Sequence, residues 1–513
     1  MNYFVNENIF TLNSGTEFSA VKRLKMFRQK GIPAKILTRN YNANLSGDLT
    51  RVGLMHEDVL NMYDYFQEVT DIPSEDLNVR YAEVIDKRMY HIEGVDANES
   101  LIKYHGDTVA KVNIAPATVG LLGSIEYYNN MNVIVVRDVW DRRGFKSSTQ
   151  YFHQDGNLGP QIFFDRNGIP KIEVIHMNIN GTLSPTMWKL LNYKGKTWRF
   201  NSEDELFAFF MTSIAQEGPS VFINDRPSLV PAVAAVQGAV AKWHYLHNVH
   251  GNNINQSGAP RQVAPYMQPL FTTFISQFNG VIVATEQQKK DIQQYFNFNN
   301  VLVLPDSFAE EVAAENLKFD LEARDKNKIV YLGRMAEDKS TLEIVDILSR
   351  VHRKLPNAKI EVYGYASPAD YQKQIEDKAE KAGLKDSIIF KGYQSDEVLA
   401  TALKEASLVL NTSPAEGYGM NLLHAMSFGV PVVAYRVKYG IEELVESGVD
   451  GELVQRGSAQ LAADAVVNLL NDSVKWSAAS RAAFDKAQSL NLDAAWSKWL
   501  EMSQTVENIF VQD

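Results

Sequence analysis

The order of hydrophobic and polar positions in the first fifty residues predicts a strand, a loop, a helix and a second strand. Residues 2–12 are extended and apolar, the polar run Asn13-Ser-Gly-Thr16 interrupts them, and residues 17–30 have helical spacing. Residues 34–38 then form a second short apolar run. This order of elements predicts half of a parallel α/β sheet.

The pattern changes between residues 54 and 199. After an expected helix around residues 57–67, short alternating segments are separated by the turn pairs Gln154-Asp-Gly156, Arg166-Asn-Gly168 and Ile179-Asn-Gly181. Asp-Gly and Asn-Gly between alternating apolar residues are typical of β-hairpins. We therefore predict an antiparallel β-rich insertion at 54–199, inside a first Rossmann-like domain made of residues 1–53 and 200–304.

Alternation of strands and helices resumes after the insertion. Predicted strands at 220–224, 243–248 and 280–284, with helices at 231–242 and 286–295, complete the first domain, and a hinge follows near 303–307. A second series of strands is predicted at 328–332, 359–363, 387–390, 406–410 and 431–434. It indicates a second doubly wound domain at 305–490, followed by a helix within 491–513 that crosses back to the first domain. Two such domains facing each other bind a ligand at the carboxyl ends of their strands.

Composition narrows the class of protein. The 513 residues are 45% hydrophobic, which suits about three folded domains, and the absence of cysteine excludes disulfides, thiolate metal sites and cysteine catalysis. A net charge of −11 argues against a general nucleic-acid binder. Without a long uncharged apolar run or an N-terminal leader pattern, we expect a cytoplasmic protein with no transmembrane segment and at most peripheral contact with the inner face of the membrane.

The strongest chemical motif is Asn411-Thr-Ser-Pro-Ala-Glu-Gly-Tyr-Gly-Met-Asn-Leu-Leu-His-Ala-Met-Ser-Phe-Gly-Val-Pro431, which follows an apolar strand and opens a helix. Its glycines let the backbone approach a ligand closely, and a helix start favours a diphosphate. The Glu416 carboxylate, just before the helix, would meet sugar hydroxyls. A turn of any α/β protein is the alternative interpretation of such a segment.

The whole string resembles the donor-binding signature of glycosyltransferase family 4, whose members have the GT-B fold and transfer sugars with retention. The resemblance assigns donor binding to Glu416, Gly417, Tyr418, Gly419, Met420 and Asn421. The family has a second glutamate eight positions after the first, where it commonly holds the nucleotide ribose. This chain has His424 there.

A second motif, Tyr331-Leu-Gly-Arg-Met-Ala-Glu-Asp-Lys339, also runs from a strand into a helix-forming segment. Arg334 can grip phosphate oxygens with two N–H groups and Lys339 adds a point charge, so together they can neutralise a diphosphate leaving group. Cations on a solvated helix start are the alternative. The pair resembles the Gly-Arg-x₄-Lys pair of the same family, which implies that no metal and no cofactor are needed.

Three histidines follow one another in Trp243-His-Tyr-Leu-His-Asn-Val-His-Gly251. The His-x₂-His spacing is compatible with a metal site. The resemblance instead makes His247 the catalytic histidine that lies against the donor sugar, with His250 next. It also places Gly15, in the loop after the first strand, near the donor phosphates or the acceptor, although an ordinary capped turn explains that loop equally well.

The insertion carries more bases than acids between residues 136 and 199. With its aromatic pairs it resembles the β-rich module of bacterial transferases that modify wall teichoic acid or serine-rich surface proteins. A basic module can collect an anionic polymer, with Arg142, Arg143, Lys146 and His250 as candidate acceptor contacts. A surface for homo-oligomers or a partner subunit is the alternative use of the module.

These features together predict a retaining, UDP-sugar-dependent hexosyltransferase of the GT-B fold. It would move GlcNAc or glucose from the UDP-sugar to hydroxyls of a serine-rich surface protein or of a poly(glycerol/ribitol-phosphate) teichoic acid. Two rival interpretations remain. His424 and Arg436, the latter at a position where relatives often carry an acid, also suit a catalytically silent GT-B subunit that stabilises an active partner. A nucleotide-sugar epimerase on the same fold would turn over without an acceptor.

Overall fold

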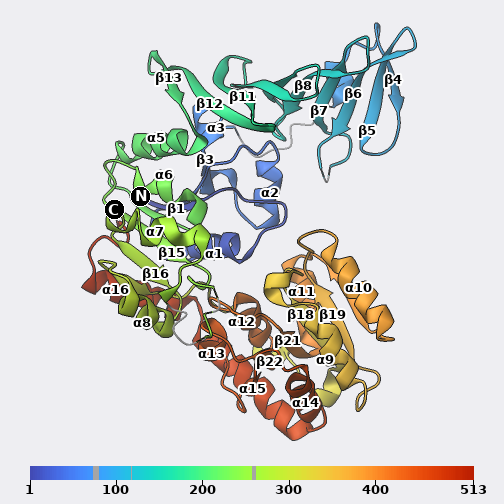
Figure 1. Cartoon of the computed structure of the whole chain (residues 1–513), viewed down its shortest axis with the longest axis vertical. Coiled ribbons are helices and arrows are strands. Elements are labelled where there is room, and N and C mark those ends of the chain that lie inside the picture. The colour runs from blue at the N-terminus through green and yellow to red at the C-terminus, as the bar shows by residue number, and fades with distance from the viewer. Residues whose placement is uncertain (73–79, 117, 253, 257–260, 513) are drawn as a thin grey trace. The chain divides into compact units, whose positions relative to one another are not determined.

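The computed structural model describes residues 1–72, 80–116, 118–252, 254–256 and 261–512, and the chain divides into two compact units (Figure 1). Unit 1 comprises Met1–Lys242 and Phe510–Asp513, and unit 2 comprises Trp243–Ile509. The boundary between the two units lies inside strand β15 (Ala241–Leu246).

Unit 1 begins as a parallel sheet. Strand β1 (Asn2–Asn6) pairs in parallel with β14 (Val221–Asn224) and with β2 (Ala34–Thr38), and helix α1 (Gly15–Gln29) joins β1 to β2. Every residue of β1 is buried, as expected for a parallel strand that is covered on both faces. The predicted strand, helix and strand of the first fifty residues are therefore confirmed.

The segment expected to be one helix at 57–67 is divided. It forms a 3-10 turn η1 (His56–Asp58), a short strand β3 (Val59–Asn61) that pairs in parallel with β2, and helix α3 (Met62–Phe66). The Asn61 side chain accepts the N–H groups of Tyr63 and Asp64, which starts α3 only after the strand. The parallel strands of unit 1 thus continue past residue 53, where we had placed the start of the insertion.

A ten-stranded antiparallel sheet follows, in the order β13-β12-β11-β10-β9-β8-β7-β6-β5-β4 (Figure 1). Its strands are β4 (His91–Gly94), β5 (Glu99–Tyr104), β6 (Asp107–Ile114), β7 (Leu122–Tyr128), β8 (Ile134–Trp140), β9 (Lys146–Phe152), β10 (Leu158–Phe164), β11 (Pro170–Ile179), β12 (Thr182–Tyr193) and β13 (Lys196–Phe200). The three predicted Asp-Gly and Asn-Gly turns join β9 to β10, β10 to β11 and β11 to β12. The antiparallel β-rich module is confirmed as a meander of consecutive hairpins.

The other helices of unit 1 are α2 (Leu45–Arg51), α4 (Tyr81–Val84), α5 (Glu203–Ala215), η2 (Pro227–Leu229) and α6 (Val230–Ala234). Helix α6 is shorter than the expected 231–242 because the chain turns at Gly238, which has a positive φ of 79°, and enters β15 at Ala241. The chain end also belongs to unit 1. There Asn2 exchanges two hydrogen bonds with the main chain of Val511, at 2.8 Å each.

Unit 2 opens with parallel strands β15, β16 (Gly280–Val283) and β17 (Val301–Val303), followed by a six-stranded parallel sheet in the order β20-β19-β18-β21-β22-β23. These six strands are β18 (Asp325–Leu332), β19 (Lys359–Tyr363), β20 (Ile388–Gly392), β21 (Ala406–Asn411), β22 (Val432–Tyr435) and β23 (Gly451–Val454). The sheet grows outwards in both directions from β18 and β21. Such a reversal of strand order is the place where doubly wound sheets bind ligands.

Helices connect the strands of unit 2 (Figure 1). They are α7 (Gln268–Phe271), α8 (Glu286–Tyr295), α9 (Glu343–Val351), α10 (Tyr371–Lys381), α11 (Asp396–Glu405), α12 (Met420–Ser427), α13 (Gly440–Leu444), α14 (Ala459–Leu470), α15 (Ser473–Ser489) and α16 (Leu492–Thr505), with 3-10 turns η4 (Pro265–Met267), η5 (Ile275–Gln277), η6 (Ala314–Asn316), η7 (Leu321–Ala323) and η8 (Glu337–Lys339). In the parts of the chain that the structure describes, none of the helices has the length and apolarity needed to cross a membrane.

Candidate functional site

The candidate site lies at the carboxyl ends of the two central strands of the six-stranded sheet. Strand β18 ends at Leu332 and is followed by Arg334, whereas β21 ends at Asn411 and leads through Glu416 to helix α12. The side-chain amide of Asn421 donates to the Leu332 carbonyl at 2.6 Å and ties the two connections together. The two motifs found in the sequence are therefore neighbours in space.

Lys339 and Glu416 form an ion pair across these connections. The distance from Lys339 Nζ to Glu416 Oε2 is 2.8 Å, and the side chains are 24% and 15% exposed. Burial lowers the pKa of Lys339, but the Glu416 carboxylate outweighs it and holds that pKa above its usual value. The ammonium is therefore fully charged at neutral pH and can bind a phosphate oxygen.

Arg334 is also paired with a carboxylate. Its Nη2 lies 2.7 Å from Asp338 Oδ2, one turn further along the chain, and both side chains are partly exposed. Exposed pairs of this kind contribute about 0.2–1 kcal/mol, so an incoming anion can displace Asp338 at little cost. Two cations therefore stand at this end of the sheet, each with a carboxylate partner.

The main chain of Glu416 is fixed by the segment that precedes helix α13. The N–H of Glu416 donates to the Lys438 carbonyl at 3.1 Å, and the Glu416 carbonyl accepts the N–H groups of Tyr439 and Gly440 at 2.7 and 3.0 Å. Three backbone hydrogen bonds thus hold the residue whose carboxylate faces Lys339.

The two glycines after Glu416 meet different steric demands. Gly419 has a φ of 91° where α12 begins, a conformation that residues with a side chain rarely adopt. A Cβ on Gly417 would lie 2.1 Å from the backbone carbonyl oxygen of His247. This close approach brings the segment after β15 against the Glu416 loop.

We expect Gly417→Ala to push the Glu416 loop away from His247 and to lower kcat about tenfold or more. An added methyl in a tight contact costs about 1–3 kcal/mol, because backbone has to move. Steady-state kinetics with the active donor measure the loss. Gly218→Ala is the control for a glycine without such a neighbour, since nothing lies within 4 Å of its added Cβ and its φ is not positive. Equal kcat in both variants would contradict the prediction.

His247 is held by an aspartate that the sequence analysis did not single out. Its Nδ1 lies 2.7 Å from Asp306 Oδ1, and the side chains are only 6% and 4% exposed. An ionised carboxylate only accepts hydrogen bonds, so Nδ1 carries the proton and the ring orientation is fixed. The ring also stacks on Tyr245, with centroids 4.5 Å apart. The signal in the sequence was a carboxylate three residues after the short apolar strand β17.

His250 and Arg143, proposed as acceptor contacts, are buried. His250 is 0% exposed and stacks between the rings of Phe271 and Tyr439. Arg143 is 1% exposed and bound to the carboxylates of Asp141 and Asp64, at 2.8 and 3.0 Å. The burial of both side chains argues against these two assignments.

The other two candidate acceptor contacts, Arg142 and Lys146, are accessible in part. Arg142 Nη1 bonds Asn44 Oδ1 at 3.3 Å in the space left by Gly47. Lys146 lies 3.5 Å from Asp138 and over the Phe164 ring. Both cations have partners within unit 1, so neither offers an isolated charge.

The remaining predicted residues have distinct surroundings. Met420 is the first residue of α12, and the Tyr418 hydroxyl donates to the Ser307 carbonyl at 3.2 Å. His424, on α12, has its Nδ1 3.9 Å from Glu310. Gly15, in unit 1, is the first residue of α1, where the N–H of Ser14 is taken up by the Glu17 carboxylate at 2.8 Å. This cap explains the Asn13-Ser-Gly loop without a ligand.

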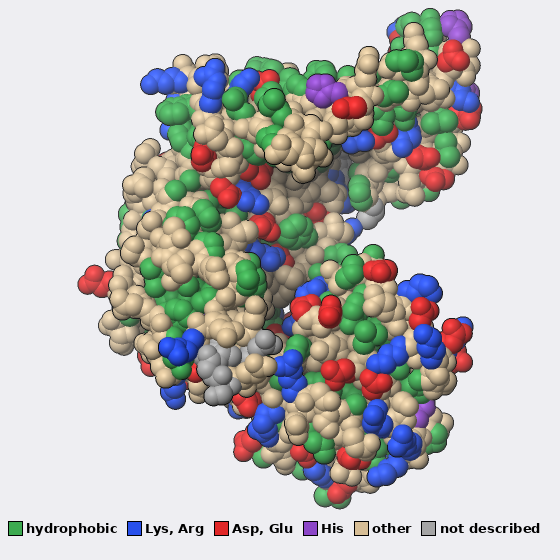
Figure 2. Space-filling view, viewed as in Figure 1, with side chains coloured by type: hydrophobic (Ala, Val, Ile, Leu, Met, Phe, Trp, Pro, Cys, Tyr) green, Lys and Arg blue, Asp and Glu red, His purple; other side chains and the backbone are tan. Residues whose placement is uncertain are grey.

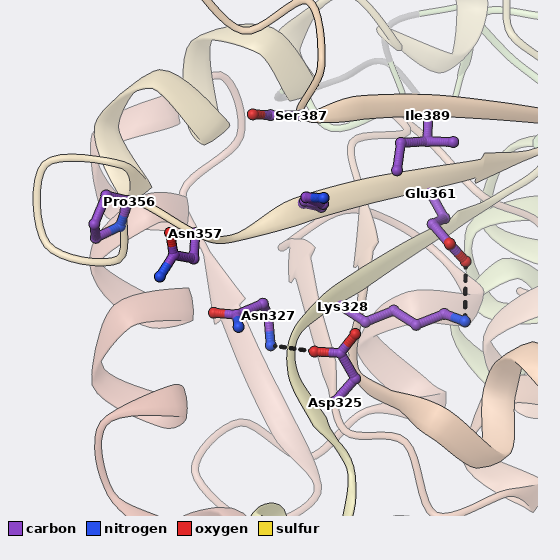
Figure 3. A pocket seen from close by; sticks show the side chains of 9 residues that line it. Asp325, Asn327, Lys328, Pro356, Asn357, Glu361, Ser387 and Ile389 are labelled. Atoms are coloured by element: carbon purple, nitrogen blue, oxygen red, sulfur yellow. Dashed lines mark hydrogen bonds and ion pairs between the residues drawn. The ribbon is translucent and has the colours of Figure 1, made fainter.

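A polar hollow of about 400 Å³ lies at the opposite ends of the same strands (Figure 3). It is formed by the amino ends of β18, β19 and β20 and contains the ion pair of Lys328 with Glu361, at 3.0 Å. None of the predicted site residues lines it. Within the described ranges no three His, Asp or Glu side chains are grouped so that they could hold a metal ion, and the expectation of a metal-free reaction stays a prediction.

Comparison with known proteins agrees with this placement. Residues 313–488, which contain Arg334, Lys339 and Glu416, match the family model described as Glycosyl transferases group 1. This part of the chain is therefore similar to glycosyltransferase domains of that group. Residues 9–180 match a second model, which describes a protein of the accessory Sec system.

Relatives extend over most of the chain. It is 24% identical to the poly(ribitol-phosphate) alpha-N-acetylglucosaminyltransferase of Staphylococcus aureus (strain COL), over 95% of this chain and 96% of the relative. It is 23% identical to the UDP-N-acetylglucosamine–peptide N-acetylglucosaminyltransferase GtfA subunit of Streptococcus parasanguinis, over 88% of each. The crystal structure of the pneumococcal O-GlcNAc transferase GtfA in complex with UDP and GlcNAc superposes with a TM-score of 0.84 at 19% identity, covering 99% of both chains.

The GT-B α/β fold predicted from the sequence is confirmed by this structural likeness. The prediction of a sugar-transferring enzyme is confirmed by the domain match together with transferase relatives that span nearly the whole chain. The roles of individual residues, the stereochemistry, the donor and the acceptor stay predictions.

Proposed function

We propose that the protein transfers GlcNAc or glucose from a UDP-sugar, with retention as in glycosyltransferase family 4, to hydroxyls of a cell-surface acceptor. The observation that carries the proposal is the group of Arg334, Lys339 and Glu416 at the point where strand order reverses in the glycosyltransferase domain. Two cations suit a diphosphate, and the carboxylate beside them suits sugar hydroxyls.

In the proposed reaction the diphosphate of the donor binds Arg334 and Lys339 in place of Asp338 and Glu416. The Glu416 carboxylate, still held through its main chain, then accepts hydrogen bonds from the sugar. The bond from the sugar C1 to the diphosphate breaks as the acceptor oxygen bonds C1 from the same face, and the proton of the acceptor hydroxyl leaves with UDP. His247, oriented by Asp306, stabilises the positive charge that develops on the sugar. Neither a metal nor a glycosyl-enzyme carboxylate takes part.

The relatives' names support both kinds of acceptor, a ribitol-phosphate polymer and a peptide. The β-rich module offers a place for an anionic chain. Lys194, Lys196 and Arg199 are exposed around the turn between β12 and β13, where Lys and Arg side chains gather on the face shown in Figure 2. We propose that this end of the module, rather than Arg142 and Arg143, collects the acceptor at the inner face of the membrane.

The test is release of UDP from UDP-GlcNAc and from UDP-glucose, each with poly(ribitol phosphate), poly(glycerol phosphate) or a serine-rich peptide. We expect acceptor-dependent release with one donor and its loss in Glu416→Ala. Turnover without any acceptor would favour the epimerase. A wild-type protein that neither binds nor turns over either donor would exclude the transferase.

A second candidate function is a silent subunit that stabilises an active transferase. Two observations favour it: the match of residues 9–180 to an accessory Sec system protein, and His424 in place of the family's second glutamate. The streptococcal relative is itself named a subunit, which also supports association with another protein. Mixing the chain with candidate transferases and measuring their melting temperatures distinguishes this role.

Introducing a glutamate at position 424 is expected to tighten UDP binding about tenfold, because a carboxylate hydrogen bond to a hydroxyl is worth about 1.5–3 kcal/mol. Glu310 Oε1 lies 3.9 Å from His424 Nδ1, so a new carboxylate would face an existing one. The variant is therefore His424→Glu with Glu310→Gln, compared with Glu310→Gln alone by UDP titration. Equal affinity of the two proteins would show that position 424 does not contact the nucleotide.

A further inference from the structure

We propose that Asp291, on helix α8, is a positioning residue for Glu416 and acts on it through Lys438 and Tyr439. The inference rests on the transfer reaction proposed above, because it concerns the residue assigned to the donor sugar. Asp291 lies outside residues 313–488, the part that matches the glycosyltransferase model. It is thus a contribution to the site from the preceding segment of the chain.

The Asp291 carboxylate is buried and satisfied by three side chains. Its Oδ2 accepts the Tyr439 hydroxyl at 2.9 Å and the Lys438 ammonium at 2.8 Å, and its Oδ1 accepts the Gln287 amide at 2.9 Å. Asp291 is 6% exposed and Tyr439 is 1% exposed. Hydrogen bonds to a charged and desolvated group are about twice as strong as those between neutral groups, so this carboxylate fixes both partners firmly.

Lys438 and Tyr439 are the residues whose backbone holds Glu416. The Lys438 carbonyl accepts the Glu416 N–H, and the Tyr439 N–H donates to the Glu416 carbonyl, which places the two segments side by side as in a parallel sheet. The chain continues into Gly440, where a Cβ would lie 2.3 Å from the backbone of Tyr418. The backbone of the 438–440 segment thus lies close against that of residues 416–418.

The route from Asp291 to the carboxylate of Glu416 is therefore short and continuous. Asp291 orients Lys438 and Tyr439 by their side chains, their backbone fixes the main chain of Glu416, and the Glu416 carboxylate reaches Lys339 at 2.8 Å. A catalytic group displaced by about 1 Å loses up to about 100-fold in rate. We expect loss of the Asp291 carboxylate to lower kcat about 10- to 100-fold, with little change in the affinity for UDP, which Arg334 and Lys339 bind.

The test compares Asp291→Ala, Asp291→Asn and Tyr439→Phe with the wild type. Asparagine still accepts from the Tyr439 hydroxyl, so Asp291→Asn should retain more activity than Asp291→Ala. Asp450→Asn is the control for a buried aspartate: it is 2% exposed and accepts the N–H of Glu446 at 2.8 Å, next to the amino end of β23. If Asp291 acts by positioning Glu416 and not by stabilising the fold in general, Asp450→Asn should leave kcat unchanged.

Two measurements keep this inference separate from the proposed reaction. The first is hydrogen exchange of residues 412–419, which reports how rigidly the main chain around Glu416 is held and needs no substrate. The second is kcat of Asp291→Ala, measured alone and in combination with Glu416→Gln. We expect faster exchange in Asp291→Ala, and no further loss of kcat when Glu416 is already replaced.

Unchanged exchange in Asp291→Ala, or an equal additional loss of kcat in the Glu416→Gln background, would overturn the positioning role. Equal effects of Asp291→Ala and Asp450→Asn on kcat would also overturn it. If exchange becomes faster but the wild type transfers no sugar, the hold on Glu416 stands and the proposed transfer reaction fails.

Discussion

Glu416→Gln is expected to lower kcat about 100- to 1000-fold while UDP affinity is kept or improved. Glutamine preserves the shape of the side chain but removes the charge, and groups that stabilise a transition state electrostatically typically contribute this much. Lys339 simultaneously loses the carboxylate 2.8 Å away, so its ammonium is released toward the diphosphate. Glu416→Gln therefore tests the two parts of the donor separately. Transfer of the sugar is lost, whereas UDP still binds.

The experiment measures kcat and KM with the active donor, and the dissociation constant of UDP by calorimetry. Glu361→Gln is a matched control, because Glu361 also pairs with a lysine, Lys328 at 3.0 Å, but at the amino ends of the same sheet (Figure 3). Loss of UDP binding in parallel with kcat would show that Glu416 holds the nucleotide instead of the sugar. Equal kcat losses in both variants would indicate a general effect on the domain.

Arg143→Met is expected to destabilise unit 1 by about 3–5 kcal/mol. The guanidinium is buried and binds Asp141 and Asp64 through ion pairs and the Val69 carbonyl at 3.0 Å, and its removal leaves two buried carboxylates without their cation. Urea unfolding at about pH 7.5 measures the loss. Arg137→Met is the control, since Arg137 pairs with Glu126 at 2.7 Å but is one-third exposed, and we expect it to cost less than about 1 kcal/mol.

The loss in Arg143→Met should shrink as the pH falls. Burial raises the pKa of Asp141 even though Arg143 opposes it, so the folded protein binds this proton more tightly than the unfolded chain. The contribution of Asp141 to stability is therefore greatest below the ordinary aspartate pKa and decreases as the pH rises through the folded value. Without Arg143 the pKa rises further, so the variant should lose less stability at about pH 5 than at about pH 7.5. A loss that does not depend on pH would contradict this account.

Local sequence patterns predicted most of the fold. Buried apolar runs such as the one in β1, and turn pairs such as Asp155-Gly156, depend on neighbours in the sequence and therefore appeared in the right places. The strand β3 was missed because three residues are too few to show alternation. The sequence located Arg334, Lys339 and Glu416 because each follows an apolar strand. Parallel strands bring their carboxyl ends to one edge of the sheet.

Long-range pairing could not be predicted from one sequence. Arg143 was a candidate acceptor contact in the sequence, yet its partner Asp64 lies 79 positions earlier and the two are buried together. Asp306 is 59 positions from His247, and no local pattern joins them. Charged residues are the hardest to place from the sequence, because the local sequence around an exposed cation can be the same as that around a buried, paired one.

Arg334 pairs with Asp338 and Lys339 pairs with Glu416, so carboxylates of the chain itself already neutralise both cations of the site. An anion with one charged group can replace only one carboxylate, and the exchange gains little because one ion pair is traded for another. A ligand with two linked phosphates replaces both carboxylates in a single binding event, and the second exchange costs no further loss of translational freedom. In the proposed reaction the two carboxylates therefore favour a diphosphate over an ion with one phosphate group, because only the diphosphate exchanges both ion pairs in one binding event.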